Sequence, residues 1–592
     1  MFFFVLEFKM NRSRKKENSY GTLKRLARES MVLSATRFVS SRLNRLFSSG
    51  FASPLFASAE KVDDFASKKI TAPINKKLDI RKKFAMPARN AVASFFSRNA
   101  IMKWLAAFKT AFLNTSLRSV GIFLLTFGIY AAAIFLLKSY VSLTIGVANP
   151  DDLSVAAVTF IVGLLLTAFG EKSILSALGN GRITGALLSG CLGVNDSSID
   201  RAKNGSSGTA VGISFLLGSL LGVLTLFFTP ASVLFIFLSI LVFVAILNVP
   251  EFGLLLSVAT VSFVHVGYLA VIAGVTLVSY LLKCLVLKRN LRFGSADAAM
   301  LLAYVVLFVA CAASNGGFDR GELYLLAFVS LYFPAKNLIC SRKLIYQTFN
   351  ALCLGLFVGM SLYLLDEYSE FISHSQLRMA AQWLTRYTLS ADMLTVLASA
   401  TLPFAFYSLL FGKKRGMLMT LLLSIACAVI TDSFWFYALI MIALFIFVAF
   451  AYKAPAGATL GAAVLLPPAF VFASDYTNSA AVSIGIEASY DSAFVFSGGV
   501  VSFWGGVMDI GGILVLITLA LALVLVIQRT FSGMLMNTAK GIVAVNGTVA
   551  ASAVVMIICS FIFNPFSDIR IIGIMWFVFG ICGSVYKLNS RS

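Results

Sequence analysis

Between residues 120 and 586 the chain is a series of apolar runs separated by short loops. Most of these runs are long enough to cross a hydrocarbon core of about 30 Å as an α-helix. Hydrophobic residues make up 59% of the chain and charged residues only 12%, about half the charged fraction of a typical soluble domain. The sequence therefore predicts an all-α, multi-pass membrane protein, and its chemistry is expected where its few ionisable groups meet the bilayer.

We expect about 14 to 16 transmembrane helices. The expected spans are 120–137, 153–170, 209–229, 231–248, 252–266, 267–287, 298–314, 321–339, 344–365, 388–411, 416–431, 434–452, 454–474, 510–528, 541–563 and 569–586. The run from 252 to 287 would be far longer than one crossing as a single helix, so we expect it to break near Gly267.

Lys and Arg fall almost entirely on alternate loops, as expected when one set of loops faces the cytoplasm. With the N-terminus inside, the inner loops carry Lys172, Arg182, Arg201, Lys203, Lys288, Arg289, Arg292, Arg342, Lys343, Lys413, Lys414, Arg415, Lys453, Arg529, Lys540, Lys587 and Arg591. The outer loops carry Arg320, Arg378, Arg386 and Arg570, with Lys138 at a span end. This bias predicts that both termini are cytoplasmic.

The first 118 residues hold 24 Lys and Arg against seven Asp and Glu. A basic segment before a first span typically stays in the cytoplasm and lies against anionic lipid. We therefore expect a basic cytoplasmic or interfacial region at 1–118 that binds membrane lipids and no nucleic acid. Residues 119–592 form the expected multi-span transmembrane domain, and its longest outer loops are 366–387 and 475–509.

The outer segment that begins at Asp366 concentrates groups that bind phosphate and sugar. It holds His374, Arg378, Trp383, Arg386 and Tyr387, and Asp392 follows at the start of the next span. Arginine binds phosphate bidentately, histidine shuttles protons near neutral pH, and aromatic rings stack on sugars. The segment indicates a pyrophosphate or glycan site. The alternative is an amphipathic interfacial helix with snorkelling arginines.

Two further outer features carry charge. Asp432 and Trp435 resemble ordinary interfacial anchors, whereas Asp568 and Arg570 form a pair that suits either a phosphate or a helix end. The loop 475–509 contains only carboxylates as charged groups: Asp475, Glu487, Asp491 and Asp509. They lack the ligand spacing of a dedicated metal site, and solvated carboxylates are the simpler interpretation.

Other polar groups give weaker signals. All eight cysteines stand singly in or beside apolar runs, so no disulfide framework, zinc site or other metal site is expected. His265 lies within an apolar run and is either a histidine bonded to backbone or part of a proton relay. Glu322, Pro334 and Lys336 share one expected span and suggest a polar seam.

Several short segments resemble the O-antigen ligase/polymerase family, and its Gram-positive branch in particular. They are Arg45–Ala52, Leu117–Tyr130, Arg289–Asp297 and Arg570–Trp576. The resemblance implies a GT-C-like helical glycosyltransferase of the bacterial plasma membrane. Such an enzyme transfers a glycan from undecaprenyl diphosphate at the outer face to a glycan or lipid acceptor, with no metal and no cofactor.

The resemblance also implies roles for particular residues. Arg386 matches the family's arginine by position, so His374, Arg378 and Arg386 are the catalytic candidates. Arg570, Trp383 and Asp392 are the candidates for substrate binding.

The chain departs from the family pattern in places: the Asn-Pro-Asn after Arg386 is absent, Phe434 stands where an arginine is usual, and 475–509 has neither arginine nor histidine. Losing cationic partners weakens transition-state stabilisation. Either Arg378, His374 and Arg570 substitute, or the chain is a divergent member without the activity. A transporter or flippase for lipid-linked glycans and a non-catalytic membrane scaffold are the alternative functions.

Overall fold

The computed structural model describes residues 115–140, 150–168, 211–285, 294–313, 320–339, 341–369, 385–411, 417–431, 513–526, 540–562 and 568–589, with isolated residues between them. Within these ranges the chain forms helices joined by turns, apart from one isolated β-bridge between Ser116 and Ser173. The predicted all-α class is therefore confirmed for the described part of the chain.

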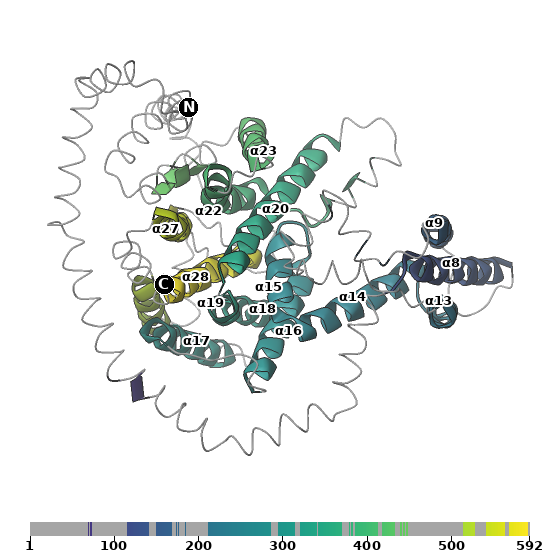
Figure 1. Cartoon of the computed structure of the whole chain (residues 1–592), viewed down its shortest axis with the longest axis horizontal. Helices are drawn as coiled ribbons and strands as arrows, with labels where there is room; N and C mark the ends of the chain where they lie inside the picture. Colours follow the sequence, from purple (N-terminus) through teal and green to yellow (C-terminus); the bar gives the residue numbers. More distant parts are fainter. Residues whose placement is uncertain are drawn as a thin grey trace, which may run out of the picture.

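The helices form a large main body and a smaller lateral unit, and one long helix connects the two (Figure 1). The lateral unit consists of α8 (Leu117–Tyr140), α9 (Pro150–Ala168) and α13 (Val211–Leu224). The connecting helix is α14 (Pro230–Asn248). The main body consists of α15 (Pro250–Ala259), α16 (Val266–Leu285), α17 (Ser295–Ala313), α18 (Arg320–Val329), α19 (Tyr332–Leu338), α20 (Arg342–Glu367), α22 (Ala391–Leu410), α23 (Met417–Thr431), α27 (Lys540–Ile562) and α28 (Ile569–Asn589).

Glycines bring the helices of the lateral unit into close contact. A Cβ on Gly163 of α9 would lie 2.5 Å from the backbone nitrogen of Leu125, and one on Gly128 of α8 would lie 2.8 Å from that of Phe160. These distances are shorter than any ordinary contact, so only glycine fits. Small residues at helix contacts are typical of proteins in lipid, where backbones pack closely and large side chains face outward.

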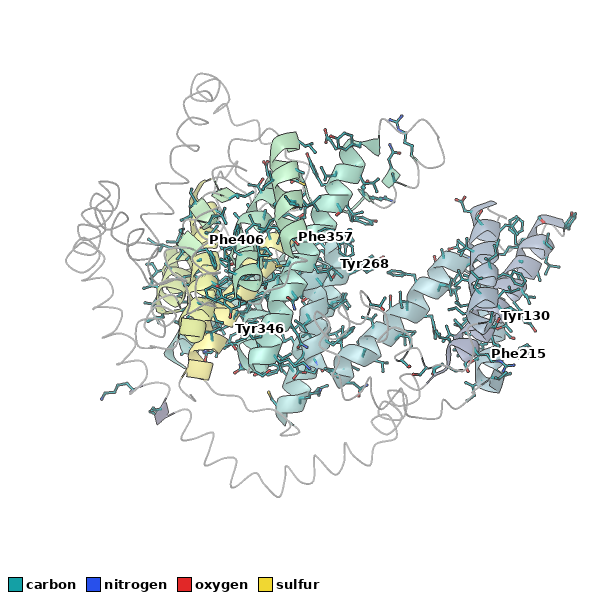
Figure 2. The ribbon with its side chains drawn as sticks, turned by 45° about the horizontal axis from the view of Figure 1, so that its top comes forward. Tyr130, Phe215, Tyr268, Tyr346, Phe357 and Phe406 are labelled. Atoms are coloured by element: carbon teal, nitrogen blue, oxygen red, sulfur yellow. The ribbon has the colours of Figure 1, made fainter. Side chains whose placement is uncertain are left out.

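The large apolar side chains of the lateral unit accordingly face outward. Tyr130, Leu165, Phe215 and Leu220 are each more than a third exposed, and Figure 2 shows Tyr130 and Phe215 on this unit. Such an extensive apolar surface is unfavourable in water and favourable in lipid. Within the described residues, six helices are long and apolar enough to cross a membrane. They are α8, α9, α14, α16, α20 and α22.

The centre of the main body is formed by α22, α27 and α28, which pack against one another. Almost every side chain of α28 from Ile571 to Val585 is buried, and Phe404 of α22 is fully buried. A glycine again allows two helices, here α28 and α19, to approach closely. A Cβ on Gly580 of α28 would meet the side chain of Ala335 and the carbonyl of Tyr332 in α19. The core of the main body thus lies among these helices.

The long apolar run at 252–287 is broken as predicted. Helix α15 ends at Ala259, a turn covers residues 260–265, and α16 begins at Val266, one residue before Gly267. The expected span 321–339 is also broken, into α18 and α19, around Ser330 and Leu331. The total of 14 to 16 spans stays a prediction, since 454–474 lies outside the described residues.

A buried ion pair joins α17 to α19. The Nζ of Lys336 donates to Oδ1 of Asp297, and both side chains are 2% exposed. The hydroxyl of Tyr332 donates to the same oxygen at 3.0 Å, while the N–H of Gly294 donates to Oδ2 at 2.6 Å. Lys336 thus belongs to the polar seam expected on this span, with Asp297 as its partner.

Candidate functional site

Three segments far apart in sequence meet at one end of the main body: the turn 260–265, the segment 385–390, and the start of α28. The N–H of Leu389 donates to the carbonyl of Ser262 at 3.2 Å. The hydroxyl of Thr385 donates to Oδ1 of Asp366, near the C-terminus of α20, at 2.6 Å. We call the side chains of His265, Arg386, Tyr387, Asp568 and Arg570 at this junction the rim cluster.

Arg570 holds the three segments together. Its Nε donates to both carboxylate oxygens of Asp568 at 2.9 Å, and its Nη2 donates to Oδ2. Its Nη1 donates to the carbonyl of Tyr387 at 2.7 Å and reaches that of Val264 at 3.4 Å. The side chain is 11% exposed. Its charge is therefore balanced by Asp568, and its donors are directed at backbone carbonyls.

The ring of Tyr387 contacts two other members of the rim cluster. The ring of His265 packs edge-on against it at 5.1 Å between centroids, and the guanidinium of Arg386 lies over it at 5.6 Å. His265 also contacts Tyr268 edge-on at 5.8 Å, and Tyr268 contacts Phe235 of α14. Figure 2 shows Tyr268 on the side of the main body that faces the lateral unit.

Arg386 differs from Arg570 in its surroundings. It is exposed, and its contact with the Tyr387 ring is the interaction the structure describes for it. A guanidinium within about 6 Å of a ring centroid is attracted to the face of the ring, and its N–H groups remain hydrogen-bond donors. Arg386 is therefore an exposed cation beside an aromatic ring, with donors suited to a phosphate.

The other predicted site residues stand apart from the rim cluster or beyond the described chain. Arg378 is half-buried, and the structure describes no contact between it and the rim cluster. Asp392 lies exposed in the first turn of α22, where a carboxylate is favourable at a helix N-terminus. His374, Trp383 and the loop 475–509 lie outside the described residues, so their predicted roles are unchanged.

Three members of the rim cluster were not among the predicted catalytic or substrate-binding residues: His265, Tyr387 and Asp568, although Asp568 was noted as the neighbour of Arg570. His265 was noted in the sequence only as a histidine within an apolar run. Its signal was the predicted break near Gly267, because a break between two spans places residue 265 at a membrane surface rather than at mid-depth. Tyr387 was noted only as one of two aromatic residues in this outer segment, because its contacts with His265 and Arg570 depend on the tertiary structure.

No known family model, curated protein or solved structure matches this chain.

Proposed function

We propose that this protein takes part in cell-envelope polysaccharide assembly and binds the diphosphate of a lipid-linked glycan at the rim cluster. Its activity is transfer of the glycan from undecaprenyl diphosphate to a glycan or lipid acceptor, at the outer face of a bacterial plasma membrane. The observation that carries the proposal is the position of Arg386: its exposed guanidinium lies 5.6 Å from the centroid of the Tyr387 ring, at the junction of three segments.

The position of the rim cluster supports an outer site. Its segments are the ones that charge alternation assigns to the outer side, whereas Lys283 donates to the carbonyl of Asn248 at the other end of α16. A diphosphate headgroup in the interfacial region would meet a cation there without crossing the hydrocarbon.

The two arginines of the rim cluster take different parts in this proposal. Arg386 binds the diphosphate, because its charge has no carboxylate partner among the described residues. Arg570 is a positioning residue: it fixes the backbone of Tyr387 through its Nη1. The Tyr387 ring in turn lies within cation–π distance of Arg386. Stabilisation of a leaving diphosphate by such a preorganised donor is typically worth about 10²-fold or more in turnover.

The test is glycan transfer by the purified protein in liposomes, from a glycan on undecaprenyl diphosphate to an acceptor glycan. We expect Arg386→Ala to lower turnover about 10²-fold and Arg386→Lys to recover part of it. Ser390→Ala is the matched control, because Ser390 is exposed on the same segment and makes no side-chain cap bond. Equal turnover by the wild type and Arg386→Ala, or no transfer by either, contradicts the proposal. Movement of the glycan lipid across the bilayer without transfer would indicate a transporter instead.

A further inference from the structure

His265 is held in a defined tautomer and direction by its own turn. The backbone N–H of Gly267 donates to Nδ1 of His265 at 3.1 Å. A nitrogen that accepts a hydrogen bond carries no proton, so the proton of the neutral ring is on Nε2. Nε2 is therefore a hydrogen-bond donor. The side chain of His265 is exposed, and the structure describes no hydrogen-bond partner for Nε2.

The ring cannot easily turn to another direction. It packs edge-on against both Tyr387 and Tyr268. The Nη1 of Arg570 reaches the carbonyl of Val264, the residue just before His265. A Cβ on Gly267 would lie 3.2 Å from the hydroxyl of Tyr324, which closes the turn from α18. Donor groups held in this way bind a ligand with little loss of conformational entropy.

His265 and Arg386 contact the same ring, that of Tyr387. The rim cluster thus presents two separate donors, one charged and one neutral, around a single aromatic side chain. A monophosphate bound to Arg386 leaves the second donor to water, whereas a diphosphate offers a second group of acceptor oxygens. We propose that Nε2 of His265 donates to the second phosphate, and that this contact makes the rim cluster selective for polyprenyl diphosphate over polyprenyl monophosphate. This inference rests on the proposed function of the cluster.

Substitution of His265 by Asn or by Gln separates the two roles of the imidazole, which are to accept the N–H of Gly267 and to donate from Nε2. In Asn, the amide oxygen takes the place of Nδ1 and can accept the Gly267 N–H, but the outward donor is lost. In Gln, the amide nitrogen takes the place of Nε2 and supplies the outward donor, while the turn bond is lost. The measurement is binding of undecaprenyl diphosphate and undecaprenyl monophosphate to the protein in phosphatidylcholine nanodiscs.

We expect the wild type to bind the diphosphate about tenfold more tightly than the monophosphate, as a hydrogen bond to a charged group allows. His265→Asn should bind both lipids about equally and unfold at the wild-type temperature. His265→Gln should keep the preference. A preference that persists in His265→Asn overturns the proposal. Loss of the preference in both variants also overturns it, because His265 would then act only through the fold of the turn.

Arg386→Ala in the same assay separates this inference from the proposed function. If that variant loses affinity for both lipids while the His265 variants match the wild type, the proposed diphosphate site stands and the role of His265 falls. If none of these variants changes binding of either lipid, both proposals fall.

Discussion

The Nη1 of Arg570 donates to the carbonyl of Tyr387 at 2.7 Å, across 183 positions of sequence. This bond joins the start of α28, the most deeply buried helix of the main body, to the segment that carries Arg386. The geometry of the exposed arginine therefore depends on a helix anchored in the core. The two arginines differ in their surroundings: Arg570 is paired with Asp568, whereas Arg386 is exposed. Arg386 was predicted as a catalytic residue and Arg570 as a substrate-binding residue.

Arg570→Lys should destabilise the protein although it conserves the charge. Lysine has no planar fork, so it cannot bind Asp568 through two nitrogens and also reach the Tyr387 carbonyl. We expect a loss of about 1–3 kcal/mol in unfolding free energy, measured by thermal unfolding in detergent. Arg386→Lys is the control, because Arg386 is exposed, and it should unfold at the wild-type temperature. Unchanged stability of Arg570→Lys would show that the bonds of Arg570 are not formed.

Replacing one partner of the Asp297–Lys336 pair should destabilise the protein more than replacing both. Either Asp297→Asn or Lys336→Met leaves an unbalanced buried charge, at a cost of about 3–5 kcal/mol. The double variant removes both charges, and we expect it to recover much of that loss. Unfolding of the two single variants and the double variant gives the coupling energy directly. Additive losses would mean that the two side chains do not interact.

Gly163→Ala should separate α8 from α9, because the new Cβ would lie 2.5 Å from the backbone nitrogen of Leu125. Overpacking of this kind typically costs about 1–3 kcal/mol. Gly274→Ala in α16 is the matched control: nothing lies within 4 Å of its Cβ position, and alanine favours a helix over glycine. The unfolding temperature should therefore fall for Gly163→Ala and rise for Gly274→Ala. A tolerated Gly163→Ala would contradict the close packing of the lateral unit.

The two ends of α20 should lie on opposite sides of the membrane. Tyr368 caps the end of this helix nearest the rim cluster, and Lys343 lies in its first turn. In a variant whose native cysteines are replaced, an impermeant maleimide added to cells should label Tyr368→Cys directly. It should label Lys343→Cys only after the cells are permeabilised. The reverse pattern would place the rim cluster inside and exclude a lipid-linked glycan at the outer face as its ligand.

The sequence alone was sufficient for the helical class and for most helix positions, because apolar runs and their loops are strong local signals. The break at 260–265 could be predicted from length, since one helix there would be far too long. The break between α18 and α19 at Ser330 and Leu331 was not predicted. The sequence does hold a signal for it, because Pro334 has no N–H to donate to the carbonyl of Ser330, four residues before it.

The candidate site was predicted only in part. Arg386 and Arg570 could be identified because outward arginines are rare in this chain, and the pairing of Arg570 with Asp568 could be expected because the two residues are close in sequence. The bond from Arg570 to the carbonyl of Tyr387 could not be predicted, because it joins segments that only the tertiary structure brings together. His265 was named for a relay or a backbone bond, and the structure shows the bond to Gly267.

The measurement that tests the central claim most directly is the affinity of the protein in nanodiscs for undecaprenyl diphosphate, compared between the wild type and Arg386→Ala as salt is raised. A charge-assisted contact predicts that Arg386→Ala binds at least about tenfold more weakly at low salt. It also predicts that the difference narrows as salt screens the exposed guanidinium. Equal affinity of the two proteins at low salt would contradict the assignment of Arg386 as the diphosphate-binding residue.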